Sequence, residues 1–233
     1  MRKLAITIFF LAAAAAQVFA ADWPPLNPAD LALKTPKIEP DADAEALLWD
    51  VRVATTLTGD TIDTIYNHYI RIKIFNDRGR DKFTTVDIDF SNKDNISDIA
   101  GRTIRPSGEI VELKKDAVFE RVVAKAGGVK EKVKSFAMPA VESGGIIEYR
   151  WKRTVTTEYV PSYFRLDFQR EIPVREVRYH VKPLTSERFP YGMRSLSLHF
   201  RPTPFVSEPN GFSLAPPGCD SFEPRVLPVS ACP

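Results

Sequence analysis

The sequence predicts an all-β fold, an antiparallel two-sheet β-sandwich with an extended N-terminal lead-in and a proline-rich C-terminal tail. Apolar and polar residues alternate with a period of two from about residue 46 onward, which is typical of strands with one buried face. Glycine, proline, asparagine and serine separate these runs, as turns require. Because no long helical period lies between the runs, two packed sheets are favoured over alternating βαβ units.

The first twenty residues have the pattern of a secretory signal peptide, with Arg2 and Lys3 before the apolar run Leu4–Ala16. Small residues at Val18 and Ala20 indicate cleavage after Ala20. The apolar run is shorter than the roughly 20 residues that a helix needs to cross a bilayer. We therefore expect residues 1–20 to be removed and the protein to be periplasmic or extracellular. If residues 1–20 are not cleaved, they would anchor the protein to the membrane, and no other membrane contact is expected.

Residues 21–45 are the expected lead-in, which five prolines keep extended. The segment 41–49 can begin with a helical turn, so the first strand is expected to start near Leu47. The β-sandwich domain is then expected over residues 46–200. Its strands are expected at residues 49–53, 66–74, 86–90, 147–155, 164–168, 177–181 and 196–200, each with one dry and one wet face.

Turn signals agree with this division. Asn76–Gly79, Pro106–Gly108 and Ser143–Gly145 each separate two alternating runs. The residues of Pro106–Gly108 fit a type I turn that a left-handed glycine closes.

Residues 201–233 form a proline-rich tail or linker with eight of the 19 prolines of the chain. Proline cannot donate a ladder hydrogen bond, so this tail cannot supply central strands. The two cysteines, Cys219 and Cys232, both lie here. In an exported protein they could pair, and a disulfide over so short a loop would add about 3 kcal/mol. The sequence leaves open whether they do.

The charge balance argues against a nucleic-acid partner. The chain has 32 Lys and Arg against 30 Asp and Glu, and the signal segment holds two of the basic residues and no acidic one. Loss of that segment leaves 30 of each sign, so the protein has no long-range field to attract a polyanion. The most basic run, Lys125–Lys134 around Gly127 and Gly128, is expected to be a solvated loop.

No metal or cofactor site is expected. Asp41, Asp43 and Glu45 have the spacing that opens a calcium loop, but Ala46 replaces its glycine and Arg52 its final glutamate. The three histidines lie on three different predicted strands without a zinc-ligand spacing. They are His68, which shares a face with isoleucines and is expected in the core or at its rim, and His180 and His199, which are expected on wet faces.

No catalytic constellation is found, and the expectation is a protein that is not an enzyme. The chain has no G-x-S-x-G motif, and no histidine follows Cys219 or Cys232. Asp87 and Asp89 project from one strand face about 6.5–7 Å apart, a separation that would suit an inverting glycosidase. Alternating aspartates on an exposed strand are, however, usual for a solvated face.

Binding is the function class that remains. The wet face of the strand Gly145–Val155 carries Glu148, Arg150 and Lys152, a mixed-charge row that could recognise a peptide, a glycan or a partner protein. The alternative is a solvated sheet face with cross-strand charge pairs, each worth about 0.2–1 kcal/mol.

Five segments, in order and spacing, carry a family resemblance. They are Tyr69–Phe75, Ile99–Val111, Lys134–Pro139, Ser143–Trp151 and Phe168–Pro173. With them the chain resembles the domain of unknown function 3857 family, the exported bacterial domain found N-terminal to transglutaminase-like domains. The resemblance implies a β-sandwich and export, and it places the enzymatic Cys, His and Asp in the following domain, which has no counterpart here.

The resemblance also implies that Ser207–Pro209 and Pro216–Pro217 link to such a following domain, and we expect the chain to be a truncated form of a longer protein. The expected function is that of a non-catalytic, exported accessory or recognition domain. The alternatives are a small exported hydrolase with surface carboxylates such as Asp87 and Asp89, and a purely structural spacer.

Overall fold

The fold is given by a computed structural model that describes residues 23–159, 166, 170–182, 184, 206–208 and 211–214. The predicted signal peptide, Cys219, Cys232, the predicted strand at 196–200 and all of 164–168 except Leu166 lie outside these residues. Among the described residues, no helix has the length and apolar character to cross a membrane.

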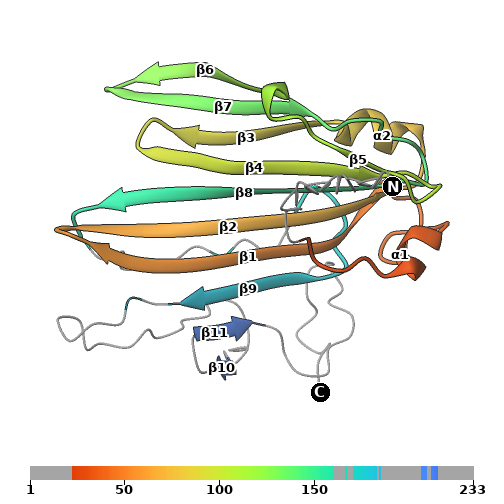
Figure 1. Cartoon of the computed structure of the whole chain (residues 1–233), viewed down its shortest axis with the longest axis horizontal. Coiled ribbons are helices and arrows are strands. Elements are labelled where there is room, and N and C mark those ends of the chain that lie inside the picture. Colours follow the sequence, from red (N-terminus) through yellow and green to blue (C-terminus); the bar gives the residue numbers. More distant parts are fainter. Residues whose placement is uncertain are drawn as a thin grey trace, which may run out of the picture.

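The strands form two sheets, as the sequence predicts (Figure 1). The larger sheet has the order β10-β11-β9-β1-β2-β8-β4-β5. Its strands are β1 (Ala44–Thr58), β2 (Thr61–Ile74), β4 (Asp94–Ile104), β5 (Ile110–Glu112), β8 (Ile146–Thr157), β9 (Val177–Lys182), β10 (Val206–Glu208) and β11 (Gly211–Leu214). The smaller sheet has the order β3-β7-β6. Its strands are β3 (Thr85–Ser91), β6 (Val118–Ala126) and β7 (Val129–Ala137).

One pairing differs from the expected antiparallel arrangement, because β9 lies parallel to β1. A long connection follows β8, and Val174 already forms a parallel bridge with Ala46 before β9 begins. A parallel strand pair needs a crossover connection of about a dozen residues or more. The connection between β8 and β9 has this length. Period-two alternation predicts where the strands lie in the sequence but not which strands pair with each other. In the tail, β10 and β11 lie at one edge of the sheet, consistent with the absence of central strands there.

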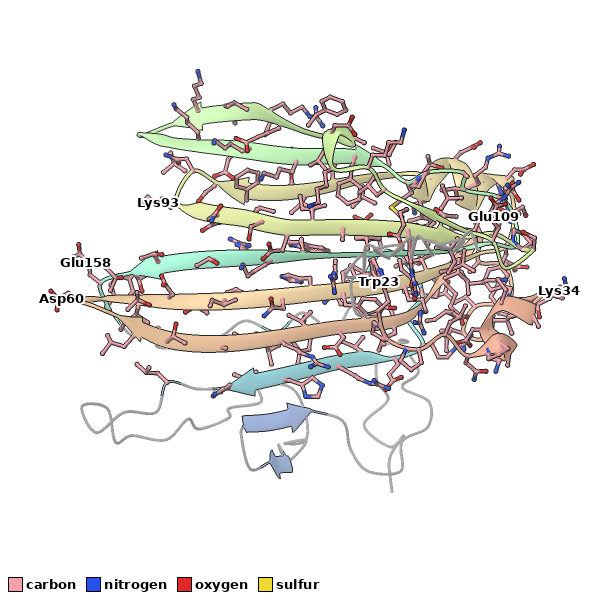
Figure 2. All side chains as sticks on the ribbon, in the orientation of Figure 1. Trp23, Lys34, Asp60, Lys93, Glu109 and Glu158 are labelled. Atoms are coloured by element: carbon pink, nitrogen blue, oxygen red, sulfur yellow. The ribbon has the colours of Figure 1, made fainter. Side chains whose placement is uncertain are left out.

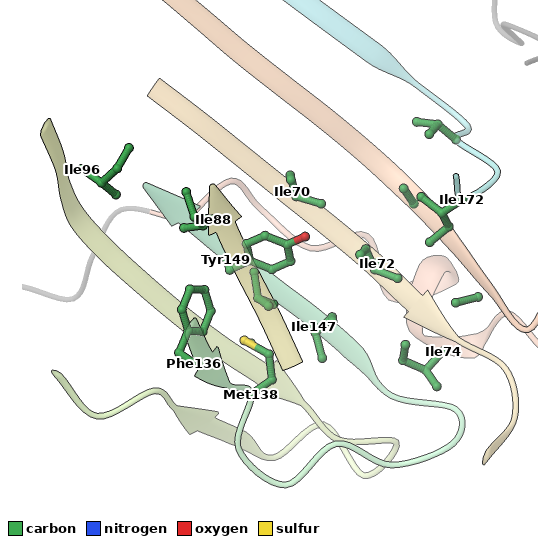
Figure 3. Close-up of a cluster of buried hydrophobic side chains, with 14 of the residues drawn as sticks. Ile70, Ile72, Ile74, Ile88, Ile96, Phe136, Met138, Ile147, Tyr149 and Ile172 are labelled. Carbon is green, nitrogen blue, oxygen red and sulfur yellow. The ribbon is translucent and has the colours of Figure 1, made fainter. Parts of the chain in front are cut away.

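The core lies between the smaller sheet and one face of the larger sheet (Figure 3). Ile70, Ile72 and Ile147 of the larger sheet pack in one buried cluster with Ile88 and Phe136 of the smaller sheet. These residues occupy alternate positions of their strands, so the dry faces inferred from the sequence are confirmed for β2, β3 and β8.

Three expectations for local structure are wrong. The strand β1 begins at Ala44 rather than near Leu47, and the proline-rich lead-in contains a short helix, α1 (Pro28–Ala32). The predicted turn at Asn76–Gly79 is the start of a second helix, α2 (Asp77–Phe83). Asn76 caps this helix by accepting from the Gly79 amide at 3.0 Å. A Cβ on Gly79 would lie 2.2 Å from the Asp43 carbonyl oxygen, so this glycine serves close packing.

The basic run Lys125–Lys134 is not a loop but the turn and adjoining parts of the β6–β7 hairpin. Gly127 and Gly128 form the turn with φ of 54° and 80°, values that favour glycine. The alternating lysines of this run are typical of a solvated segment, and for this reason the sequence predicts a loop. A 3-10 turn, η1 (Lys115–Ala117), precedes the hairpin.

Ile72 offers a test of this core. Its side chain is 1% exposed, so replacement by alanine should lower the free energy of unfolding by about 2–5 kcal/mol. The matched control is Ile110→Ala, because Ile110 is half exposed and should change stability by about 0.5 kcal/mol or less. Urea unfolding followed by fluorescence gives both values. Equal effects of the two substitutions would contradict the described core.

Candidate functional site

The second face of the larger sheet carries a buried carboxylate, Glu148, that binds three side chains. Glu148 is 0% exposed. Its Oε1 accepts from the Tyr69 hydroxyl at 2.6 Å and from the Arg71 Nε at 2.5 Å. Its Oε2 accepts from the Arg102 Nε at 2.5 Å. One carboxylate is therefore held between two guanidinium groups and a phenol.

Strand register explains this cluster. Glu148 on β8 lies directly opposite Arg71 on β2 and opposite Arg102 on β4. Directly opposed residues of antiparallel strands project from the same face with their Cβ atoms about 5 Å apart. The two arginines thus reach the same carboxylate from both sides. Burial and the Glu148 carboxylate raise the pKa of Tyr69 well above its ordinary value, so the phenol stays protonated and donates.

The N-terminal segment, residues 23–43, covers this cluster. Arg71 donates to the carbonyl oxygens of Pro24 and Pro25 at 2.8 and 3.2 Å. The Trp23 ring lies 4.9 Å from the Arg102 guanidinium carbon and 5.1 Å from that of Arg150, at cation–π distance. Figure 2 labels Trp23 over the larger sheet.

A second buried carboxylate, Glu45, fixes the rest of the N-terminal segment. Its Oε2 accepts from the backbone amides of Lys37 and Ile38 at 2.7 and 2.9 Å. Its Oε1 accepts from Arg175, which also binds Asp30 at 2.8 Å. Glu45 therefore holds backbone in place directly, and Glu148 does so through Arg71.

The expected mixed-charge binding row at Glu148, Arg150 and Lys152 is thus not formed as predicted. Glu148 is buried under the N-terminal segment, whereas Arg150 and Lys152 are half-buried. Arg150 packs against Trp23, and Lys152 forms an ion pair with Asp98 at 2.6 Å. Alternation predicts that the sheet face opposite the core is exposed, whereas here the N-terminal segment covers that face. The signal that could have shown this is the Trp23-Pro24-Pro25 sequence, which is apolar and extended.

The carboxylates proposed for a hydrolase lie on β3, on the exposed outer face of the smaller sheet. Asp87 accepts from the Ser135 hydroxyl at 2.5 Å and from Arg121 at 3.3 Å. Asp89 is exposed and lines a cleft at the end of the sheets. No feature near the pair favours the catalytic interpretation over a solvated strand face.

His68 lies among aromatic rings at the rim of the core. Its imidazole stacks on Trp151 with ring centroids 4.3 Å apart and lies 6.3 Å from the Tyr66 ring. Burial, with smaller contributions from Arg153 and Arg170, lowers the pKa of His68 to about 4. A neutral, stacked imidazole agrees with the expected rim position. His180 is half-buried on β9, and His199 lies outside the described residues.

Two cavities flank the larger sheet. The first, which we name the end cleft, has a volume of about 420 Å³. Its lining residues are Asp89, Phe90, Ser91, Lys93, Asp94, Glu131, Arg153, Val155, Thr156, Thr157 and Tyr159. Figure 2 shows Lys93 and Glu158 at this end of the strands.

The end cleft combines charge, hydroxyls and an exposed ring. Arg153 binds Asp94 at 2.6 Å, which leaves Asp89, Glu131 and Lys93 outside any ion pair with a described residue. The Tyr159 ring is 71% exposed. Polar groups of both signs beside an accessible aromatic surface are typical of sites that bind peptides or sugars.

Metal binding finds no support in the part of the chain that the structure describes. No group of three or more His, Cys, Asp or Glu there has the arrangement of a metal site.

The fold and these sites define an all-β domain with a buried ionic face and open clefts at its margins. The chain belongs to the DUF3857 family, a domain of unknown function with solved structures, whose model matches residues 63–192. This confirms the family resemblance seen in the sequence. No curated protein matches the chain.

One solved structure shows a similar fold in a longer protein. A protein described as a "putative protease" from Parabacteroides distasonis is 20% identical, with a TM-score of 0.51 over 73% of this chain and 34% of that chain. The present chain thus spans about a third of that protein's length. A "putative nutrient binding protein" from Legionella pneumophila is 10% identical over 61% of this chain and 51% of that one, with a TM-score of 0.29. This TM-score is too low to indicate a shared fold.

Replacing Glu148 tests the buried ionic cluster. Glu148→Ala should lower the free energy of unfolding by about 3–5 kcal/mol, because it leaves Arg71 and Arg102 buried without their counter-ion. Urea unfolding measures this loss, and the exposed Glu112→Ala is the control. A loss below about 1 kcal/mol would show that the cluster does not hold the N-terminal segment.

His68 predicts a loss of stability in acid. The unfolded chain binds a proton at His68 near pH 6.5, whereas the folded protein does so only near pH 4. Between these values the unfolded state binds more protons, so stability should fall as the pH drops from 6.5 to 4, by at most about 3 kcal/mol from this residue. Thermal unfolding across this range should show a shallower decline for His68→Phe. Identical declines in the two proteins would contradict the assignment.

Proposed function

We propose that the chain is a non-catalytic, exported accessory domain that recognises a ligand through the end cleft, beside a transglutaminase-like catalytic domain. The observation that carries the proposal is the end cleft itself, with Tyr159 exposed and Asp89 and Glu131 unpaired among the described residues. The ligand class that fits this lining is a peptide or a glycan, because both offer polar groups beside a flat or apolar face.

The distribution of buried charge supports a non-catalytic role. A catalytic carboxylate or base needs access to a substrate and a pKa near the working pH. Glu148 and Glu45 instead lie under the N-terminal segment in ion pairs with arginines, and His68 is stacked between rings. These groups stabilise the sheet and its covering segment.

The accessory role beside a second domain has separate support. The signal-like residues 1–20 favour export, and the family resemblance associates this domain with a transglutaminase-like neighbour. The similar structure from Parabacteroides distasonis has about two thirds of its chain outside the matched part, which leaves room for such a neighbour.

Tyr159 provides the test of recognition. Titration of the purified protein with soluble peptidoglycan fragments, followed by calorimetry, should detect binding that Tyr159→Ala weakens about tenfold, as loss of an aromatic contact residue does. The control is Phe119→Ala, which removes an equally exposed ring from β6, outside the end cleft.

Two outcomes would overturn the proposal. Absence of binding to peptidoglycan fragments and to a glycan array would remove the recognition function and favour a structural spacer. Turnover of the same fragments that Asp87→Asn abolishes would establish the hydrolase alternative.

A further inference from the structure

The second cavity lies at the opposite end of the sheet, beside α1, and we name it the α1 pocket. Its volume of about 380 Å³ lies within the range of roughly 300–1,000 Å³ that is usual for small-molecule sites. Its lining residues are Pro28, Leu31, Ala32, Leu33, Lys34, Lys73, Phe75, Pro106, Ser143 and Gly144. The lining contains two lysines and no acidic residue. Figure 2 shows Lys34 at this end, far from Lys93 of the end cleft.

Lys73 places a buried ammonium group between the walls of the α1 pocket. Its residue is 1% exposed. The Nζ donates to the carbonyl oxygens of Leu31 and Gly144 at 2.7 and 2.6 Å, and both of these residues line the pocket. An ammonium group has three donors, so a third remains for another acceptor.

Lys73 differs from the other buried charges of this face in having no counter-ion among the described residues. Arg71 pairs with Glu148, and Glu45 pairs with Arg175. Glu45 lies directly opposite Lys73 in the strand register, but its oxygens are taken by Arg175 and two backbone amides.

The groups around Lys73 favour the binding of an anion next to its ammonium group. Burial and, to a smaller extent, the charge of Lys34 lower the pKa of Lys73 to about 8, against the opposite effect of Asp30. Asp30 is itself bound to Arg175 at 2.8 Å. A buried charge costs several kcal/mol unless it is paired, and Lys73 still carries its proton at neutral pH.

The other lining residues of the α1 pocket indicate which kind of group the ligand carries beside its anionic group. Leu31, Leu33, Phe75 and Pro106 give the pocket apolar walls around the buried ammonium. We propose that the α1 pocket binds a small carboxylate with an apolar chain, whose carboxylate pairs with Lys73 and whose chain packs on these walls. This inference concerns a different site from the end cleft and does not depend on it.

Octanoate is the probe for this site. Calorimetric titration of the protein with octanoate at pH 7 should give saturable binding, and Lys73→Met should weaken it about ten- to hundredfold, because a charge-assisted hydrogen bond is lost. Methionine keeps the apolar stem, so the fold should persist, which thermal unfolding of the variant verifies. Lys125→Gln, on exposed β6, is the matched control and should bind as the original does.

Three further measurements separate the charge from the apolar contact. Octanoate affinity should fall as the pH rises from 7 to 10, and this fall should be absent in Lys73→Met. Octanol and inorganic phosphate should each bind at least about tenfold more weakly than octanoate, because each lacks one half of the recognition. Ala32→Trp, which fills the pocket and leaves residue 73 unchanged, should also abolish binding and serves if Lys73→Met fails to fold.

The proposal is overturned if octanoate does not bind, if Lys73→Met binds it as the original protein does, or if octanol binds equally well. None of these results depends on Tyr159, so failure here and failure of recognition at the end cleft remain distinguishable.

Discussion

The pairing of Glu148 with Arg71 and Arg102 determines how the rest of the molecule is arranged. Three adjacent strands, β2, β8 and β4, contribute one residue each. Glu148 and Arg71 are buried, and the Arg102 side chain is 13% exposed. A buried ion pair is stable only if its geometry is good and its remaining donors are bonded. Here the remaining donors of Arg71 reach the carbonyl oxygens of Pro24 and Pro25. The cluster therefore requires the N-terminal segment, and the segment requires the cluster.

Proline is well suited to this role. It has no amide hydrogen, and consecutive prolines favour an extended conformation without internal hydrogen bonds. The carbonyl oxygens of Pro24 and Pro25 are therefore free to accept from a side chain. A segment of ordinary residues could instead add to the edge of a sheet or form a helix, and both would use these carbonyl groups. The prolines of the lead-in explain why it lies across a sheet face rather than beside a strand.

The sequence predicts the strands better than it predicts their surroundings. Alternation locates β1, β2, β3, β8 and β9 because each has a face that packs in the core, and burial there depends on the strand's own pattern. It misses β6 and β7, since these edge-proximal strands carry charges on both faces. The parallel β1–β9 pair is also missed, because partner choice depends on a connection that carries no periodic signal.

The candidate site could be predicted only in part for a related reason. Glu148 belongs to the predicted mixed-charge row with Arg150 and Lys152, and the structure places it between Arg71 and Arg102. The alternation of β8 does not indicate its burial, because the segment that covers its partners Arg71 and Arg102 begins at Trp23, more than a hundred positions earlier. Tyr159 and Lys73 carried no sequence signal at all. An exposed tyrosine after a strand and a lysine among isoleucines are each common, and only their place beside a cavity gives them meaning.

The ionic face that holds the N-terminal segment contains charged groups that stabilise the fold in ion pairs and one charged group that is available to a ligand. Opposed residues on neighbouring strands form pairs where an arginine faces a glutamate, as at Arg71 and Glu148. Lys73 also faces a glutamate, Glu45, yet that carboxylate binds Arg175 and the backbone of the covering segment. The covering segment thus binds Arg71 and Glu45, whereas the Lys73 ammonium has no counter-ion among the described residues. In a protein interior such a charge persists only at a cost in stability, which a bound anion would offset.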